Sequence, residues 1–527
     1  MPAFSNPLLT AASVLALVVL PTPAVAQHAG HMPGMKMPAP KKPVAKPKPA
    51  AKKPVAKKKA SAKRAPAKKV APVRKAAPPP SPQEPPMNHS QHHEMQQAIP
   101  HTQAQPAPAM PPMDHSQMDH SMQGQAVSID AAPAEEIHLH TAALGPYPMT
   151  REASGTAWQP DRSEHIGWMS QSGEWTLMTH GVVNLVADHQ SGPRGDDKVF
   201  ASGMLMGMAR RPLGNGTLQL RGGISPDPLM GSRGYPLLLA SGETADGNDR
   251  LIDRQHPHDF FMELSASLSQ NIGPKSSAFL YAGLPGEPAF GPPAFMHREA
   301  IMDSPEAPIS HHWLDSTHIS FGLVTAGVVH DNLKLEVSRF NGREPDEHRW
   351  DIETGPLDST AVRLSWNPSD TLSLQGSWGY FEDPEELEPG VDQKRWSASA
   401  LYAREVAPGW KLASTLAWGR KTIVHDGETL RDDAFVAEAS LKHRGWTMFG
   451  RGEIAENREL LDLEEHGPAY RVGKVSLGGV KDVRLAEHLS LGAGGLLSVN
   501  FVPDGLAPLY GGHNPVGAMG FLRLKLN

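Results

Sequence analysis

The stretch Val516–Leu526, VGAMGFLRLKL, alternates strictly between apolar and charged residues over its second half. Leu522 and Leu524 flank Arg523, and Lys525 follows. Successive side chains of a β-strand point to opposite faces, so one face of this strand is apolar and the other is charged. A strand with lipid on one side and water on the other has this pattern. The stretch therefore predicts a transmembrane β-strand.

The same kind of segment recurs from about residue 154 to the end of the chain. Segments of roughly ten residues with alternating polarity and many Gly, Trp and Tyr are typical of an all-β transmembrane barrel. We expect antiparallel strands over residues 174–188, 199–211, 215–224, 258–269, 276–283, 316–330, 333–340, 358–366, 371–380, 393–404, 410–420, 432–443, 446–455, 472–482, 488–499 and 516–526. The number of these segments is even, as hairpin-built outer-membrane barrels require.

The connections between these segments alternate in length. Short links occur at residues 212–214, 271–275, 331–332, 367–370, 406–409, 444–445 and 484–487, and longer stretches such as 225–257, 284–315 and 341–357 lie between them. Outer-membrane barrels have tight periplasmic turns and long outer loops, which would put both termini in the periplasm. A soluble β-sandwich or propeller is the alternative, since it also consists of many short alternating strands.

The start of the chain predicts export. Residues 1–26 contain an apolar run, Leu8–Leu20, followed by Ala24-Val25-Ala26, a small-x-small cleavage pattern that would leave Gln27 as the mature start. The run is too short for a good membrane-spanning helix. We therefore expect a cleaved signal peptide and a protein of the cell outer membrane.

Residues 27–153 have the composition of a disordered periplasmic arm. Residues 38–86 are mostly Lys, Ala and Pro. The segment from Lys41 to Lys75 contains fifteen Lys and Arg and no Asp or Glu. Such a segment cannot bury a core and predicts an extended spacer. It is either a solvated tether or a basic element that binds anionic lipid headgroups or envelope polymers. Nucleic acid is a poor partner for an exported chain.

The arm also carries repeated short motifs rich in Met and His, MNHSQHHEM from Met87 and MDHSQMDHSM from Met113. Thioether sulfur favours Cu(I), and imidazole with carboxylate also suits Cu(II), so the mixture indicates copper ions as ligand or cargo. The candidate ligands are His89, His92, His93, Met95, Met113, His115, Met118, His120 and Met122. The alternative is a polar linker whose Met and His content is incidental.

MDHSQMDHSM resembles the Met/His-rich N-terminal region of the outer-membrane copper resistance protein B family. That resemblance implies copper binding and resistance, with periplasmic copper proteins as partners. Four further segments, GPRGDDK at Gly192, SGETADG at Ser241, RQHPHDFFMEL at Arg254 and the closing YGGHNPVG, are similar to those of a little-characterised envelope β-barrel family. The second resemblance implies the fold.

Within the barrel, the period of two predicts which side chains face the lumen. Met178 and His180 on one strand, and Met204, Met206 and Met208 on the next, should face water, while Leu177 and Leu205 face lipid. A methionine stripe is a packing feature in many proteins. Beside His180 it is also a candidate path for Cu(I), because conduction needs several weak sites.

Two long loop stretches carry further candidate ligands, His256, His258, His311 and His312, and the second stretch also contains His297, Met302 and His318. These residues could bind a divalent metal, perform acid/base chemistry or hydrogen-bond within the loops. No Walker loop, HExxH or GxSxG motif is present, so we expect no enzyme. Copper homeostasis is the main functional hypothesis. The alternatives are a general porin or envelope scaffold and a hydrolase that uses the loop histidines.

Overall fold

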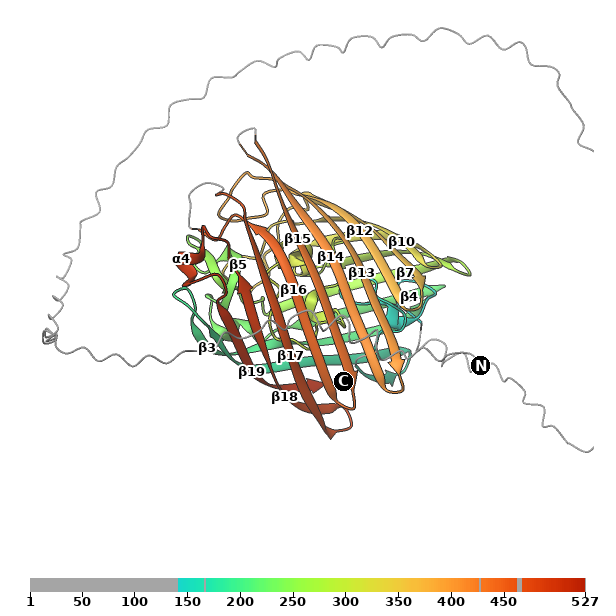
Figure 1. The fold of residues 1–527 in the computed structure, drawn as a ribbon. Helices are drawn as coiled ribbons and strands as arrows, with labels where there is room; N and C mark the ends of the chain where they lie inside the picture. Colours follow the sequence, from blue (N-terminus) through green and yellow to red (C-terminus); the bar gives the residue numbers. More distant parts are fainter. Residues whose placement is uncertain (1–140, 165–166, 426–427, 462–466, 527) are drawn as a thin grey trace, which may run out of the picture. The chain divides into compact units, whose positions relative to one another are not determined.

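The computed structural model describes residues 141–164, 167–425, 428–461 and 467–526. Sixteen of the described strands pair antiparallel in sequence order, and the last strand pairs with the first of the set, which closes a barrel (Figure 1). These strands are β2 (Trp175–Gln190), β3 (Asp197–Leu213), β4 (Gly216–Ile224), β7 (Phe261–Gly273), β8 (Ser276–Gly283), β9 (Leu323–His330), β10 (Leu333–Phe340), β11 (Ser359–Ser369), β12 (Leu372–Phe381), β13 (Gln393–Ala407), β14 (Trp410–His425), β15 (Glu428–His443), β16 (Trp446–Asn457), β17 (Tyr470–Ala486), β18 (Leu489–Phe501) and β19 (Val516–Leu526). The predicted antiparallel barrel is confirmed, and each expected strand overlaps one of these.

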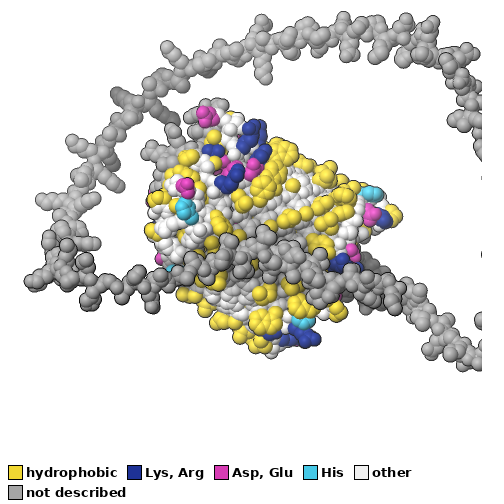
Figure 2. Space-filling model, in the orientation of Figure 1, with side chains coloured by type: hydrophobic (Ala, Val, Ile, Leu, Met, Phe, Trp, Pro, Cys, Tyr) yellow, Lys and Arg dark blue, Asp and Glu magenta, His cyan; other side chains and the backbone are white. Residues whose placement is uncertain are grey.

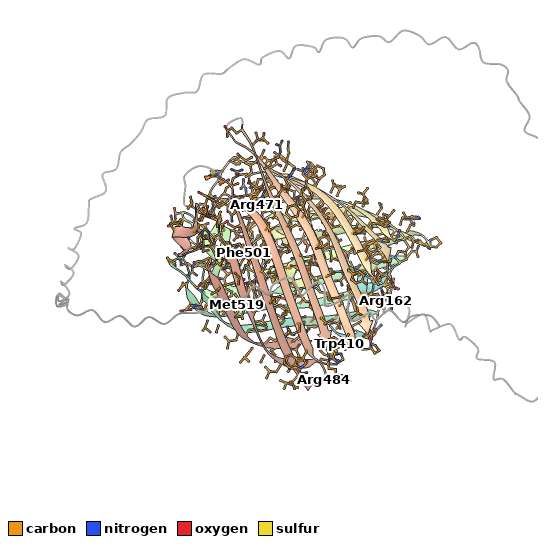
Figure 3. All side chains as sticks on the ribbon, in the orientation of Figure 1. Arg162, Trp410, Arg471, Arg484, Phe501 and Met519 are labelled. Carbon is orange, nitrogen blue, oxygen red and sulfur yellow. The ribbon has the colours of Figure 1, made fainter. Side chains whose placement is uncertain are left out.

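The two ends of the barrel differ in their connections. Two residues separate the strands at each of the seven short links, and at Arg444 and Gly445 both φ angles are positive, 49° and 76°. Positive φ at both positions characterises a type I′ turn, which matches the twist of a hairpin. Figure 3 shows Trp410 and Arg484 at the short-turn end and Arg471 at the other end. The long connections, such as residues 225–260 and 284–322, leave from that other end.

The barrel wall separates an apolar outer face from a polar inner face. On β10, Leu333, Leu335 and Val337 are 42%, 46% and 44% exposed, whereas the alternate residues Lys334 and Glu336 are fully buried. On β19, Leu522 and Leu524 likewise face outward and Arg523 faces inward. Hydrophobic side chains cover much of the wall visible in Figure 2, with charged ones gathered towards its ends. This is the surface of a transmembrane barrel. No helix in the described ranges is long and apolar enough to cross a membrane.

Several expected strand ends are wrong, and the differences are largest in two regions of the chain. The strand expected over 316–330 begins only at Leu323, because residues 316–318 form the 3-10 turn η4 (Ser316–His318) and Gly322 has a φ of 107°. Residues 421–425 and 428–431, expected within a loop, extend β14 and β15, which pair as far as His425 and Glu428. In each case a local backbone preference or cross-strand pairing overrides the polarity pattern.

Several short elements lie outside the sixteen strands. β1 (Trp168–Ser172) pairs with Trp175–Thr179 of β2, beyond the point where β19 stops pairing with that strand. A hairpin of β5 (Tyr235–Thr244) and β6 (Arg250–Gln255) forms a separate sheet. The short helical turns are η1 (Met149–Arg151), η2 (Asp227–Met230), η3 (Phe295–His297), α3 (His311–Leu314) and α4 (Ala507–Tyr510).

Three inserts pack against the inner wall. The N-terminal insert, residues 141–164, includes residues expected to belong to the arm. Its backbone carbonyls accept hydrogen bonds from wall side chains: Ser269 Oγ donates to Ala143 O at 2.7 Å, and Ser277 Oγ to Leu144 O at 2.6 Å. Lys334 of β10 donates to the carbonyl of Thr156. Since buried backbone groups must be paired, the polar inner wall holds this insert in place.

The other two inserts are residues 225–260, the first long insert, and 284–322, the second long insert. Arg298 of the second long insert forms ion pairs with Glu438 of β15, at 2.8 Å, and with Asp315. Leu237 to Leu239 of β5 are buried in an apolar cluster with wall residues such as Phe521. The interior is therefore packed with protein where these inserts lie.

Candidate functional site

A row of sulfur atoms crosses three neighbouring strands on the inner side of the wall. Met169 of β1 pairs with Met178 of β2, and Met178 pairs with Met208 of β3. One step along, His180 pairs with Met206. Directly opposed residues have their Cβ atoms about 4.5–5.5 Å apart, so these side chains lie within reach of one another.

These residues line a cavity of about 120 Å³, which we call the methionine chamber. The inserts contribute the rest of its soft lining: Met149 from the N-terminal insert, and His297 and Met302 from the second long insert. The thioether and imidazole side chains that line it are Met149, Met169, Met178, His180, Met206, Met208, His297 and Met302. The imidazole rings of His180 and His297 have centroids 5.9 Å apart. Six thioethers and two imidazoles match the ligand preference of Cu(I).

The charged residues that line the chamber have partners. Arg221 forms an ion pair with Glu263 at 2.6 Å. Glu164 pairs with Lys411 at 2.8 Å and with Lys442 at 3.0 Å; burial alone would raise its pKa, but these two lysines lower the pKa to about 2. Burial lowers the pKa of His297 to about 3. The chamber thus offers sulfur and imidazole to a cation, while its Glu164 carboxylate is already paired with two lysines.

The predicted orientation of the neighbouring side chains is confirmed. Leu177 and Leu205 are exposed on the outer face. On the same two strands, Met178, His180, Met206 and Met208 line the chamber on the inner side. Met204, however, does not line the chamber but packs with Met262, Ile319 and Phe321 in an apolar cluster, which also includes Met206 of the chamber lining. The expectation that Met204 faces water is wrong, because the second long insert covers it. Metal binding by these residues stays a prediction.

The loop histidines gather in one place inside the barrel. His256 lies with its ring centroid 5.8 Å from that of His312 and 6.4 Å from that of His311. His256 Nε2 lies 3.1 Å from Glu243 Oε1, and His312 Nδ1 lies 3.1 Å from Glu344 Oε1. Burial lowers the pKa of His256 well below its ordinary value. For His312, burial opposes protonation, but Glu344 raises its pKa.

Three histidines of this group converge most closely. His258, His311 and His318 are all buried, and one ring nitrogen from each lies within 4.8 Å of the others. The first long insert supplies His258, and the second supplies the other two. A substrate must reach the nitrogen of a histidine that acts as a general acid or base. The burial of these three rings therefore limits any role in acid/base chemistry.

The candidate ligands of the arm lie outside the described residues. These are His89, His92, His93, Met95, Met113, His115, Met118, His120 and Met122. Their assignment to copper stays a prediction.

Two residues of the chamber lining, Met149 and Met169, were not among the ligand candidates drawn from the sequence. Met149 and Met169 belong to a turn and a short strand that the alternation pattern does not mark. His297, Met302 and His318 were seen in the sequence but could not be placed beside a particular strand. The abundance of Met and His in residues 296–318 is the signal that pointed to them.

Comparison with known proteins gives a likeness of fold. No family model and no curated protein matches the sequence. The solved structures that match include an anion-selective porin from Comamonas acidovorans, with 13% identity, a TM-score of 0.40, and coverage of 67% of this chain and 100% of the porin. Salmonella typhi OmpF, solved in complex with daunomycin, has 10% identity, a TM-score of 0.44, and coverage of 68% and 100%. The outer-membrane channel DcaP of Acinetobacter baumannii has 11% identity, a TM-score of 0.38, and coverage of 69% and 100%.

Proposed function

We propose that this protein is an outer-membrane β-barrel that binds copper as part of copper homeostasis, with Cu(I) held in the methionine chamber. The observation that carries the proposal is the convergence of six thioethers and two imidazoles on one cavity. Thioethers are poor ligands for hard cations and good ones for Cu(I). Methionine is otherwise a core-filling residue, but most of these side chains are only partly buried and border empty space.

The arm and the chamber are connected by the course of the chain. The carbonyl of Thr141, the first described residue, accepts a hydrogen bond of 2.7 Å from Arg210, which lines the chamber. In the sequence, the Met/His motifs therefore precede a segment whose first described residue contacts the lining of the chamber. We infer that the arm collects copper in the periplasm and that the chamber receives it. The apolar outer face of the barrel and the predicted signal peptide support the outer-membrane location.

A copper-tolerance assay tests this proposal. A strain lacking the protein is complemented with the wild type or with the chamber variant Met169→Leu/Met178→Leu/Met208→Leu, in which the arm is intact. We expect the chamber variant to be more copper-sensitive than the wild type, because leucine fills the space without offering sulfur. The matched control is Met448→Leu, since Met448 is 59% exposed on the outer face. Equal tolerance of the chamber variant and the wild type would contradict the proposal.

The second candidate function is general diffusion of small solutes. Sixteen strands and tight turns at one end favour it, because porins share both features. The three inserts oppose a wide pore: Arg298, for example, reaches across to Glu438 of the wall and is fully buried. Conductance in planar bilayers separates the two candidates. Copper binding with little conductance supports the copper proposal, and stable large conductance supports the porin.

A further inference from the structure

The first and second long inserts meet at three histidines, which we call the histidine centre. His258 precedes β7, while His311 and His318 lie on α3 and η4 of the other insert. The ring centroid of His318 lies 5.1 Å from that of His258 and 5.2 Å from that of His311. All three residues are buried. Segments more than 50 residues apart in sequence therefore bring three imidazoles to one point.

One nitrogen of each ring is already engaged. His258 Nδ1 lies 2.8 Å from Asp227 Oδ2, and His311 Nδ1 lies 2.9 Å from Asp315 Oδ1. His318 Nδ1 donates to the carbonyl oxygen of Asp315 at 2.8 Å. A carboxylate or carbonyl on one nitrogen fixes the tautomer and leaves the other nitrogen as a lone-pair donor. Metal-binding histidines are held in the same way.

Two of the three opposite nitrogens lack such partners. The Nε2 atoms of His258 and His318 are buried and have no hydrogen-bond partner among the described residues. An unpaired polar atom in a buried position is destabilising, because it has lost its hydrogen bonds to water and gained none in return. A metal ion at the centre would satisfy both nitrogens at once. Packing alone offers no partner for either.

The acceptors that orient the rings are themselves fixed to the barrel. The backbone N–H of Gly203 on β3 donates to Asp227 Oδ1 at 3.1 Å. Asp315 pairs with Arg298, whose guanidinium also donates two hydrogen bonds of 2.8 Å to Glu438 of β15. The centre is thus supported by two strands of the wall, β3 and β15. Such support holds ligands in a defined geometry, as a metal site requires.

We propose that the histidine centre binds one divalent transition-metal ion of the class that prefers imidazole, such as zinc, through His258, His311 and His318. The ion cross-links the two long inserts inside the barrel. Three imidazoles with one position left for water or another donor form a common zinc arrangement. This site shares no residue with the methionine chamber and does not rest on the proposed role in copper handling.

Cobalt(II) is a suitable probe, because its visible absorption bands report a tetrahedral site and thioethers bind it poorly. The full-length protein is stripped with a chelator and titrated with Co(II), and zinc is then added to displace it. We expect the wild type to show tetrahedral bands that zinc abolishes. His258→Gln and His318→Gln should each lower the Co(II) affinity at least tenfold. The arm is unchanged in every variant, so its background cancels.

The matched control is His312→Gln, because His312 is buried beside His311 but pairs with Glu344. The control should bind Co(II) as the wild type does. Bands that are the same in the wild type and the His258→Gln variant would overturn the proposal, and so would an absence of bands in the wild type. Loss of the bands in the control alone would overturn the choice of ligands.

A second variant keeps the proposal testable if the glutamine variants do not fold. The chain has no cysteine, so His258→Cys introduces its only thiol. Thiolate is a strong zinc and cobalt ligand. We expect a cobalt–thiolate charge-transfer band in this variant and none when the thiol is placed at Ser277, a buried wall residue. A missing band in a folded His258→Cys variant would contradict the proposal.

Discussion

The methionine chamber and the histidine centre lie inside the same barrel, yet the structure builds them differently. The chamber is half-open, and its thioethers come mainly from adjacent strands of the wall. The centre is buried, and its imidazoles come from two inserts, each ring held by an acceptor. A thioether has no tautomer to fix, whereas a hydrogen bond at one nitrogen of an imidazole fixes the tautomer and orients the other nitrogen as a ligand. Under our two proposals, the chamber is an exchangeable soft site and the centre is a pre-organised one.

The largest expected effect comes from the support of the histidine centre. Arg298→Ala leaves Asp315 and Glu438 buried without the guanidinium that pairs with both. Removing one partner of a buried ion pair costs about 3–5 kcal/mol. We expect a loss of this size in the free energy of unfolding, measured by denaturant titration. The control, Arg420→Ala, breaks a partly exposed pair with Asp433 and should cost at most about 1 kcal/mol. Equal losses in the two variants would show that the centre is not pre-organised by this pair.

A smaller effect is expected when the orienting carboxylate loses its charge. Asp227→Asn keeps the size of the side chain that holds His258 Nδ1. Mutation of such partners lowers metal affinity about 10- to 100-fold. We expect Co(II) affinity to fall within that range, while Asp249→Asn, an exposed change in the same insert, leaves it unaltered. An unchanged affinity in Asp227→Asn would mean that the second nitrogen does not tune the site.

The smallest effect is expected at Met204, which faces inward but packs against apolar side chains and does not line the chamber. Met204→Leu replaces a side chain in contact with Met262, Ile319 and Phe321. A volume-conserving change of this kind costs less than about 1.5 kcal/mol. Cu(I) binding should be unchanged. If this variant instead loses Cu(I) binding to the same degree as Met178→Leu, then Met204 is a Cu(I) ligand and not only a packing residue.

The barrel could be predicted from the sequence because a membrane imposes the same rule on each strand. Alternation such as that of Leu522, Arg523 and Leu524 follows from lipid outside and polar groups inside. The tight links could also be predicted, since Gly445 readily adopts the positive φ that a two-residue hairpin turn requires. What failed were strand ends, at residues 316–322 and 421–431, where turns and pairing decide the boundary.

The candidate sites could be predicted only in part. The period of two placed Met178, His180 and Met208 on the inner face, because neighbours along a strand fix that face. The partners from the inserts, Met149 and Met302, could not be placed, since an insert has no periodicity that relates it to the wall. His258 and His311 were recognised as ligand types, but their meeting with His318 depends on the fold of both long inserts.

We propose that the wall of the barrel, and not only the arm, binds Cu(I). The most direct test is a Cu(I) titration of the full-length protein under reducing conditions against a competing chelator. The wild type is compared with Met169→Leu/Met178→Leu/Met208→Leu, and Met448→Leu serves as the outward-facing control. We expect the triple variant to bind one Cu(I) fewer than the wild type and the control. Equal Cu(I) binding by all three proteins would contradict the proposal and leave the arm as the only place for copper.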